Sequence, residues 1–251
     1  MERRLAIKEL PSGVRLVINL ADRAIGMNIL HGRFELNELE FVRRTVRQGQ
    51  HVIDVGAHVG LFAMHMAALV GAGGSVHAFE PMDENAECLE LGVRENRFDD
   101  RLIVERKAVG RESATGQLAI VPNSPNTGGA FLLQADTPVP GGYDIRPVPV
   151  VALDDCALRR PVSFIKLDAK GAEPFVVSGA SRLLHEDRPI VLSQLDALHL
   201  RRAAGVSTDA FVGQMNAAGY RCHELGAGVV GEVLAHVPAA GVTPVVFLPL
   251  D

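Results

Sequence analysis

Short apolar runs alternate along the chain with longer segments in which apolar residues recur at helical spacing. Seven apolar runs predict buried strands, at residues 52–53, 75–79, 102–104, 163–167, 189–195, 220–225 and 242–250. Five segments between or beside them predict helices, at residues 35–47, 61–70, 82–97, 171–184 and 207–218. Strands that alternate with helices in this way predict an α/β fold with a doubly wound, mainly parallel sheet of seven strands.

The beginning of the chain has a different pattern. Residues 1–32 alternate apolar and polar positions around Pro11-Ser12-Gly13, which predicts a small N-terminal β-hairpin. Residues 33–251 then predict one domain, because no linker divides them and a chain of 251 residues suits a single large α/β core.

One segment of that domain departs from the alternation. In residues 111–150, glycine, proline, asparagine and serine interrupt short apolar runs, which predicts an inserted hairpin and a loop that lies over the substrate as a lid. Disorder is the alternative for residues 134–146.

Composition narrows the class of protein. A net charge of −5 disfavours a nucleic-acid partner, because proteins that bind RNA or DNA usually carry a basic surface. The three cysteines are far apart and form no Cys-x-x-Cys pair, which indicates free thiols in a reducing cytoplasm. No apolar run approaches the roughly 18 residues of a membrane span, and the first residues lack the apolar core of a signal peptide. We therefore expect a cytoplasmic protein without a membrane span.

The strand at 52–53 ends at Asp54 and runs into a turn that contains Gly56 and Gly60. Glycine permits positive φ and close approach of the backbone, so the N–H groups at the start of the next helix are free to face a ligand. A dinucleotide-binding turn has the spacing Gly-x-Gly-x-x-Gly, but His58 stands two residues after Gly56, which argues against NAD or FAD. The Asp54 carboxylate can instead hold a cationic amine or ligand hydroxyls.

A second acid, Glu80, closes the next apolar run and is followed by Pro81. In sheets of this kind an acid in this position binds the hydroxyls of a ribose about 20 residues beyond the glycines. Glu80 lies 80 − 60 = 20 residues after Gly60. The third strand leads to Ala108, at the same edge of the sheet, where the base of a nucleoside ligand would pack.

The order of these motifs resembles that of class I S-adenosylmethionine (SAM) methyltransferases. Asp54-Val-Gly-Ala-His-Val-Gly60 resembles their glycine motif, and Ala78-Phe-Glu-Pro81 resembles the segment that carries the ribose acid. Phe164-Ile-Lys-Leu-Asp-Ala-Lys-Gly-Ala-Glu173 resembles the signature Lys-Ile-Asp-x-Glu-Gly-x-Glu of the FkbM family. Phe34-Glu35 and Asn126-Thr-Gly-Gly-Ala130 extend the resemblance, which covers residues 30–195.

The resemblance implies which residues bind the cofactor SAM. The expected SAM-binding residues are Glu35, Asp54, Gly56, Ala57, His58, Gly60, Glu80, Pro81 and Ala108. The residues of the glycine motif would position the amino-acid end of SAM, and Glu80 would hold its ribose. Glu35 stands where the family often has an acid near the ligand, although an acid in the first turn of a helix also interacts favourably with the helix dipole.

Asp168 ends the fourth strand, and the resemblance places it near the transferred methyl group. There it would orient an acceptor hydroxyl, act as a base or bind a metal; the alternative is that it caps the following helix. His199, just after the fifth strand, is the histidine best placed to act as a base, although histidines are also common on surfaces. Asp168 and His199 are therefore the catalytic candidates.

Two positions depart from the family pattern. Lys170 stands where the signature usually has Glu, and Gln194 stands where the family often has an acid. We therefore expect no metal ion, because Mg²⁺ and Ca²⁺ prefer several charged oxygen ligands. The same departures leave open an altered substrate or a loss of activity.

The resemblance implies a SAM-dependent methyltransferase. We expect it to methylate a hydroxyl of a small-molecule acceptor, such as a sugar, a glycolipid or a polyketide-type natural product. An N-methyltransferase of a small amine and an inactive SAM-binding protein are the alternatives. The sequence leaves open whether the chain forms a homo-oligomer.

Overall fold

The computed structural model of the protein describes residues 4–124, 126–133 and 141–250. Within them the main sheet has eight strands in the order β13-β12-β14-β11-β10-β3-β4-β5. These strands are β3 (His51–Val55), β4 (Ser75–Phe79), β5 (Leu102–Glu105), β10 (Val162–Leu167), β11 (Ile190–Asp196), β12 (Tyr220–Gly226), β13 (Val229–Val233) and β14 (Val242–Pro249). The α/β prediction is confirmed, and β13 adds an edge strand to the seven predicted ones.

The direction of the strands brings the expected site residues to one edge of the sheet. β5, β4, β3, β10 and β11 are parallel to one another, whereas β14 pairs antiparallel with both β11 and β12. Lys166 of β10 pairs in register with Asp54 of β3. The segments that follow β3, β4 and β10 carry Gly56, Glu80 and Asp168, so all three residues lie at the carboxyl edge.

Side chains that alternate along the central strands fill one apolar core on each face of the sheet. Val52 and Phe164 belong to one core, whereas their neighbours Ile53 and Ile165 belong to the other. The first core is completed by α2 (Leu36–Thr45), α3 (Leu61–Val70) and α4 (Asp83–Asn96), and the second by α5 (Glu173–Ser178), α6 (Ser181–Asp187) and α8 (Thr208–Ala217). The sheet is therefore doubly wound, as predicted.

The segment predicted as one helix over 171–184 is two helices, α5 and α6. The break falls at Gly179 and Ala180. A Cβ atom on Gly179 would lie 2.1 Å from the carbonyl oxygen of Gly110, so the chain passes too close to its neighbour there for any side chain. Between β11 and α8 the chain forms two short helical segments, α7 (Ala197–His199) and η3 (Leu200–Ala204).

The predicted N-terminal hairpin is present as β1 (Leu5–Glu9) and β2 (Arg15–Asn19), which pair antiparallel. Hydrogen bonds between Arg15 and Asn96 join the hairpin to the end of α4. The prediction missed a short helix that follows, α1 (Ile25–Leu30). Its Ile29 is buried in the first core, the one that contains Val52 and Phe164.

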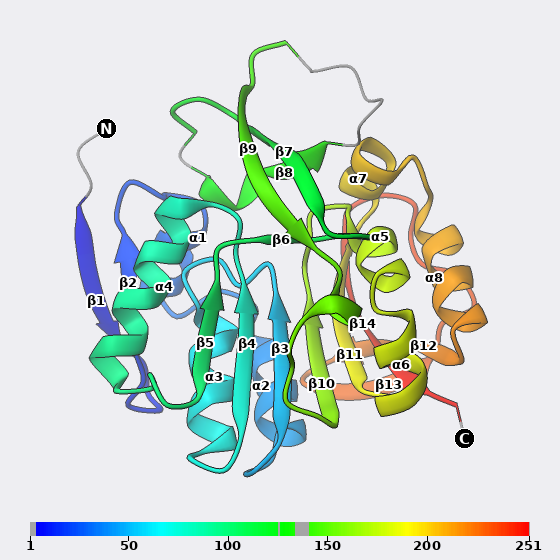
Figure 1. Ribbon diagram of the computed structural model, residues 1–251, viewed down its shortest axis with the longest axis horizontal. Coiled ribbons are helices and arrows are strands. Elements are labelled where there is room, and N and C mark those ends of the chain that lie inside the picture. The colour runs from blue at the N-terminus through cyan, green and yellow to red at the C-terminus, as the bar shows by residue number, and fades with distance from the viewer. Residues whose placement is uncertain (1–3, 125, 134–140, 251) are drawn as a thin grey trace.

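The inserted segment forms a second sheet in the order β6-β9-β7-β8. Its strands are β6 (Ala108–Val109), β7 (Ala114–Ile120), β8 (Phe131–Leu133) and β9 (Asp144–Val151), and two short 3₁₀ helices, η1 (Thr127–Gly129) and η2 (Leu153–Asp155), lie beside them. Figure 1 shows β7, β8 and β9 beyond the arrowheads of β3, β4 and β5. The sequence also left disorder open for residues 134–146. Of these, residues 134–140 lie outside the described part of the chain, and the strand β9 begins at Asp144.

Among the described residues, no disulfide links the three cysteines: Cys88 and Cys222 are buried and Cys156 is half-buried. In the part of the chain that is described, none of the helices combines the length and the apolar character needed to span a membrane.

Candidate active site

Two cavities open at the carboxyl edge of the main sheet. The larger encloses about 660 Å³, a volume that includes space open to solvent, and the smaller about 380 Å³. Gly56, His58 and Asp168 line both cavities. A ligand that fills both cavities would cross the turn between β3 and α3.

The glycines of this turn are required by close approaches of the chain. Gly56 has φ +79°, and a Cβ atom on it would lie 2.0 Å from the carbonyl oxygen of Asp168. Gly60 has φ +91°, and a Cβ atom there would lie 2.3 Å from the Leu89 side chain. The N–H groups of Gly56 and Ala57 both donate to the carbonyl of Phe79 at the end of β4. The turn is thus fixed between the ends of β4 and β10.

Glu80 is buried next to the turn, with 6% of the residue exposed. One carboxylate oxygen accepts the main-chain N–H of His58 at 2.8 Å, and the other accepts the N–H of Met82 at 3.0 Å and the Asn85 amide at 3.4 Å. Burial raises the pKa of Glu80, while these hydrogen bonds and the nearby His58 oppose the rise. Glu80 therefore presents a rigid acceptor to the larger cavity.

The larger cavity combines this acid with apolar walls. Pro81 and Ala108, both expected to bind the ligand, line it together with Glu80. Apolar side chains from the main and inserted sheets complete the wall: Val55, Phe79, Val109, Leu118, Phe131 and Leu132. A polar group beside a broad apolar surface suits a nucleoside, because the ribose needs hydrogen bonds and the base needs a dry surface.

The smaller cavity is lined by charged groups, among them Glu35, Asp54 and Lys166. Asp54 is 1% exposed, and no hydrogen-bond partner reaches its Oδ2 among the described residues. Burial raises the pKa of Asp54 to about 7, although the Lys166 ammonium opposes the rise. Burial likewise raises the pKa of Glu35 to about 7. For both acids burial outweighs the attraction of Lys166, so a ligand ammonium beside them would favour their ionised forms and complete the site.

Lys166 supplies the opposite charge in the same cavity. It is 2% exposed, and its Nζ lies 5.0 Å from the centre of the Phe62 ring and 4.0 Å from Asp168 Oδ2. A cation over an aromatic face is stabilised where water is absent. The smaller cavity thus offers both signs of charge, which matches the zwitterionic amino-acid end of SAM.

Asp168 lies on the wall that the two cavities share. Its Oδ1 accepts a hydrogen bond from Lys170 Nζ at 2.7 Å, and its side chain is 16% exposed. Burial acts to raise the pKa of Asp168, but the ammonium groups of Lys170 and Lys166 outweigh burial and hold the pKa below its usual value. Asp168 does not cap the next helix, because α5 begins at Glu173 and its N-cap residue is Ala172.

The structure does not bring every expected residue into the cavity walls. Gly60 lies behind the turn against Leu89, and His199 is absent from the linings of both cavities. His199 lies in α7, and its Nδ1 is 2.7 Å from Oδ2 of Asp196, the last residue of β11. Gln194 also lies outside the linings of both cavities, and its side-chain amide donates a hydrogen bond to the Glu38 carboxylate. Among the described residues, no group of three or more His, Cys, Asp or Glu side chains is arranged so that it could hold a metal ion.

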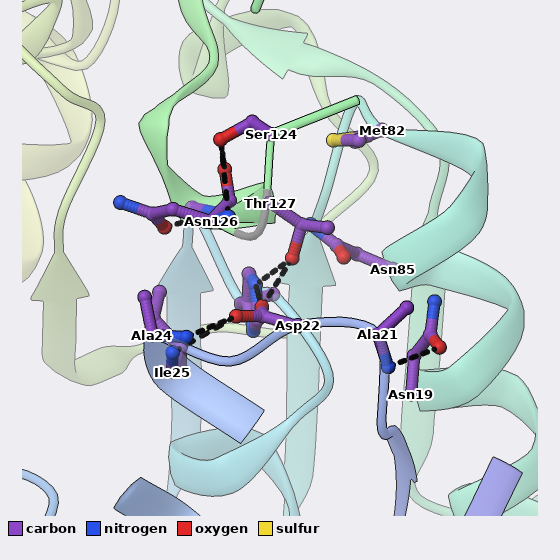
Figure 2. A network of polar contacts seen from close by, with 12 residues as sticks. Asn19, Ala21, Asp22, Ala24, Ile25, Met82, Asn85, Ser124, Asn126 and Thr127 are labelled. Carbon is purple, nitrogen blue, oxygen red and sulfur yellow. Dashed lines mark hydrogen bonds and ion pairs between the residues drawn. The ribbon is translucent and has the colours of Figure 1, made fainter. Parts of the chain in front are cut away.

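Sequence reasoning missed the role of Asp22, which is buried beside the site. Figure 2 shows its carboxylate between the main-chain N–H groups of Ala24 and Ile25 and the hydroxyl of Thr127. His58 Nε2 lies 2.8 Å from the same hydroxyl and 3.4 Å from Asp22 Oδ2. The available signal was an aspartate three residues before a short apolar helix, but nothing local indicates its contact with Thr127.

Comparisons with known structures agree with the fold. A putative rRNA methylase from Clostridium thermocellum superposes with a TM-score of 0.53 at 11% identity, over 85% of this chain and 94% of the other. A SAM-dependent O-methyltransferase from Thermotoga maritima gives a TM-score of 0.50 at 11% identity, over 98% and 78% of the two chains. A methyltransferase FkbM from Methylobacillus flagellatus KT gives 0.50 at 16% identity, over 84% of this chain and 50% of the other.

No curated protein matches the sequence. The family model described as "Methyltransferase FkbM domain", however, matches residues 54–222, a range that runs from Asp54 of the glycine motif to β12 and includes Glu80, Thr127 and Asp168. The match covers more than half of the chain and joins the motifs that form the two cavities. The chain therefore belongs to the FkbM family and is a SAM-dependent methyltransferase.

Proposed function

We propose that the protein transfers the methyl group of SAM to a hydroxyl of a small molecule, such as a sugar, a glycolipid or a polyketide-type natural product. The observation that carries this proposal is the position of Asp168. It is an ionised carboxylate on the wall shared by the two cavities, with one oxygen held by Lys170. A hydroxyl acceptor must be oriented and must lose a proton, and a fixed carboxylate serves both needs.

The residues around the cavities suit SAM. Glu80 would accept hydrogen bonds from the ribose hydroxyls, and Pro81 and Ala108 would lie beside the adenine. Glu35 and the unpartnered Oδ2 of Asp54 would hold the ammonium, and Lys166 the carboxylate. When bound, SAM supplies an electrophilic methyl group on a sulfonium sulfur. Gly56 and Ala57 would allow the backbone to approach it closely.

Asp168 would act on the acceptor. Because its pKa is held low, it stays ionised at neutral pH and can accept a hydrogen bond from the acceptor hydroxyl. A hydroxyl becomes strongly acidic as its oxygen gains a methyl group, so even a weakly basic carboxylate can take the proton late in the reaction. His199 lies outside both cavity walls. We therefore propose Asp168, and not His199, as the group that accepts the proton of the acceptor hydroxyl.

The inserted sheet favours a small acceptor. Thr127, Ala130 and Phe131 form part of the wall of the larger cavity, so the insertion would enclose a bound ligand together with the main sheet. The net charge of −5 also favours a small molecule over RNA. The cytoplasmic location and a role in natural-product biosynthesis belong to the same proposal.

The experiment that tests the proposal separates SAM binding from turnover. Calorimetric titration with SAM and NAD⁺ should show binding of SAM alone. Asp54→Ala and Glu80→Ala should weaken SAM binding, whereas Asp168→Ala and Asp168→Asn should reduce turnover more than SAM affinity. Equal SAM affinity in all of these variants and the parent would contradict the assignment of the site.

Product mass identifies the acceptor class. A panel of hydroxylated small molecules should gain one methyl group, and matched amines should not. Methylated amines without methylated alcohols would support N-methylation instead.

One contact supports a second candidate, a SAM-binding protein without transferase activity. Lys170 Nζ occupies an oxygen of Asp168 that an acceptor would otherwise reach, and the family signature usually has Glu at this position. If the parent binds SAM without transfer and Lys170→Glu creates transfer, this second candidate is correct. Robust transfer by the parent would eliminate it.

A further inference from the structure

The Thr127 hydroxyl connects three segments that are far apart in the sequence. It lies 2.5 Å from Asp22 Oδ2, which precedes α1, and 2.8 Å from His58 Nε2, in the glycine turn. Asp22 is fixed from its other side, because Oδ1 accepts the N–H groups of Ala24 and Ile25. Figure 2 shows Asp22 and Thr127 facing each other across this contact.

The chemistry of the three groups fixes the direction of their hydrogen bonds. Burial acts to raise the pKa of Asp22, but the neighbouring His58 ring and the hydrogen bonds from Thr127 and Ile25 outweigh it and lower the pKa to about 2, so the carboxylate is ionised. An ionised carboxylate only accepts, so the single hydroxyl hydrogen of Thr127 is donated to Asp22. Thr127 must then accept a hydrogen bond from His58 Nε2–H. The other ring nitrogen, Nδ1, has no polar partner among the described residues.

This arrangement holds His58 in an unusual backbone conformation. His58 has φ +52°, a left-handed conformation that costs free energy in any residue with a Cβ atom. In that conformation its main-chain N–H points at Glu80 Oε2, at 2.8 Å. The contacts of the side chain with Thr127 and Asp22 offset part of the cost and so help to keep the His58 N–H directed at Glu80.

We propose that Asp22 and Thr127 are positioning residues for SAM, which act through His58 to orient the Glu80 carboxylate toward the ribose. The inference rests on the proposed role of Glu80 as the ribose acid. It gives residues 1–32, through Asp22, and the inserted segment, through Thr127, an indirect part in cofactor binding. Asp22 lies outside residues 54–222, the range that matches the family model.

The first test compares two substitutions at one position. Thr127→Val keeps the shape of the side chain but removes the hydroxyl, whereas Thr127→Ser keeps the hydroxyl. We expect Thr127→Val to raise the dissociation constant of SAM about tenfold, and Thr127→Ser to change it by less than about twofold. Asp187→Asn is the matched control for Asp22→Asn, because Asp187 is also hydrogen-bonded, with a side chain only 8% exposed, but lies at the opposite edge of the sheet, against Arg160 and Val162. Asp22→Asn should weaken SAM binding, and Asp187→Asn should not.

The second test observes His58 directly. The ¹⁵N signals of a histidine ring distinguish a protonated nitrogen from one with a lone pair, and we expect Nε2 to be protonated in the parent. In Asp22→Asn the new amide can donate to Thr127, whose hydrogen is then free to turn to His58. The ring should therefore change to the Nδ1–H tautomer, an effect that mere loss of stability would not produce.

Two results would overturn the inference: unchanged SAM affinity in folded Thr127→Val, or an equal loss in Thr127→Ser and Thr127→Val. Failure of the proposed function has a different signature. A parent that binds SAM but methylates no hydroxylated acceptor overturns the proposed function alone, because SAM affinity and the ¹⁵N signals are measured without an acceptor.

Discussion

Gly56 and Asp168 meet at the carboxyl ends of β3 and β10, where a Cβ atom on Gly56 would lie 2.0 Å from the Asp168 carbonyl oxygen. The main-chain N–H of Asp168 donates to the carbonyl of Val55, the residue before Gly56. The cofactor turn and the catalytic candidate are therefore parts of one rigid junction. A change in either residue should disturb both cavities.

Gly56→Ala tests this junction. The new methyl group would meet main-chain atoms that cannot move cheaply, at a φ of +79° that alanine avoids. We expect a loss of about 2–4 kcal/mol in the free energy of unfolding and a large loss of SAM affinity. Gly213→Ala is the control, because Gly213 lies in α8 with nothing within 4 Å of the added atom. That change should stabilise the protein by about 0.5–1 kcal/mol; similar effects at the two positions, measured by urea unfolding, would contradict the argument.

The sequence was sufficient to predict the parts of the fold that have a strong local pattern. The apolar runs at β3, β4 and β10 and the glycines between β3 and α3 are signals of this kind. β13 was missed because most of its residues are exposed and Gly231 interrupts it, so only its pairing with β12 makes it a strand. The break between α5 and α6 was missed because the close approach of the Gly110 carbonyl to Gly179, which lies at the break, joins residues that are distant in the sequence.

In the candidate site, too, features with a local sequence pattern could be predicted, whereas contacts between distant residues could not. Asp54, Glu80 and Asp168 each end a recognisable strand, so the sequence predicts the edge at which they gather. The contact between Asp22 and Thr127 joins residues 105 positions apart and has no local pattern. His199 was chosen for its place after β11, but the fold turns its ring toward Asp196. Side-chain direction in a short helix is set by tertiary packing, which a single sequence does not show.

Asp54→Asn should stabilise the protein while it weakens SAM binding. The pKa of Asp54 is raised from 3.8 to about 7 by burial, so the folded state holds a proton that the unfolded state releases within this range. Stability from this group therefore falls as pH rises from about 4 to about 7, and it stays low above that range. We expect the substitution to add about 1–3 kcal/mol to the free energy of unfolding at about pH 8, and less than about half as much at about pH 5.

Asp187→Asn is the control with the opposite sign. The pKa of Asp187 is lowered, because its hydrogen bonds with Arg160 and Val162 outweigh burial. Its contribution to stability is present at neutral pH and is lost as pH falls through the lowered value. Asp187→Asn should therefore destabilise the protein at about pH 8. Thermal unfolding at both pH values measures the contrast, and a loss of stability in Asp54→Asn at the higher pH would contradict the prediction.

SAM affinity should rise with pH between about pH 5.5 and about 7. Glu35 and Asp54 both have pKa values raised to about 7 in the free protein, so they are largely protonated at the lower pH. A ligand ammonium binds their ionised forms and lowers both pKa values, so binding must release protons. Calorimetry in buffers of different ionisation enthalpy counts these protons. Adenosine is the control ligand, because it lacks the amino-acid end; the prediction fails if its affinity changes as steeply as that of SAM.

Substitution of Lys170 should move the pH dependence of turnover. The Lys170 ammonium at 2.7 Å is the main influence that offsets burial and keeps the pKa of Asp168 low. Lys170→Met removes this charge at similar length, so the pKa of Asp168 should rise and a larger fraction of the carboxylate should be protonated at low pH. The acid limb of the kcat profile should therefore move to higher pH, with turnover retained above it. Lys170→Arg keeps the charge and should leave the limb close to its position in the parent. If the two variants lose turnover equally at every pH, Lys170 holds the shape of the site and does not set the ionisation of Asp168.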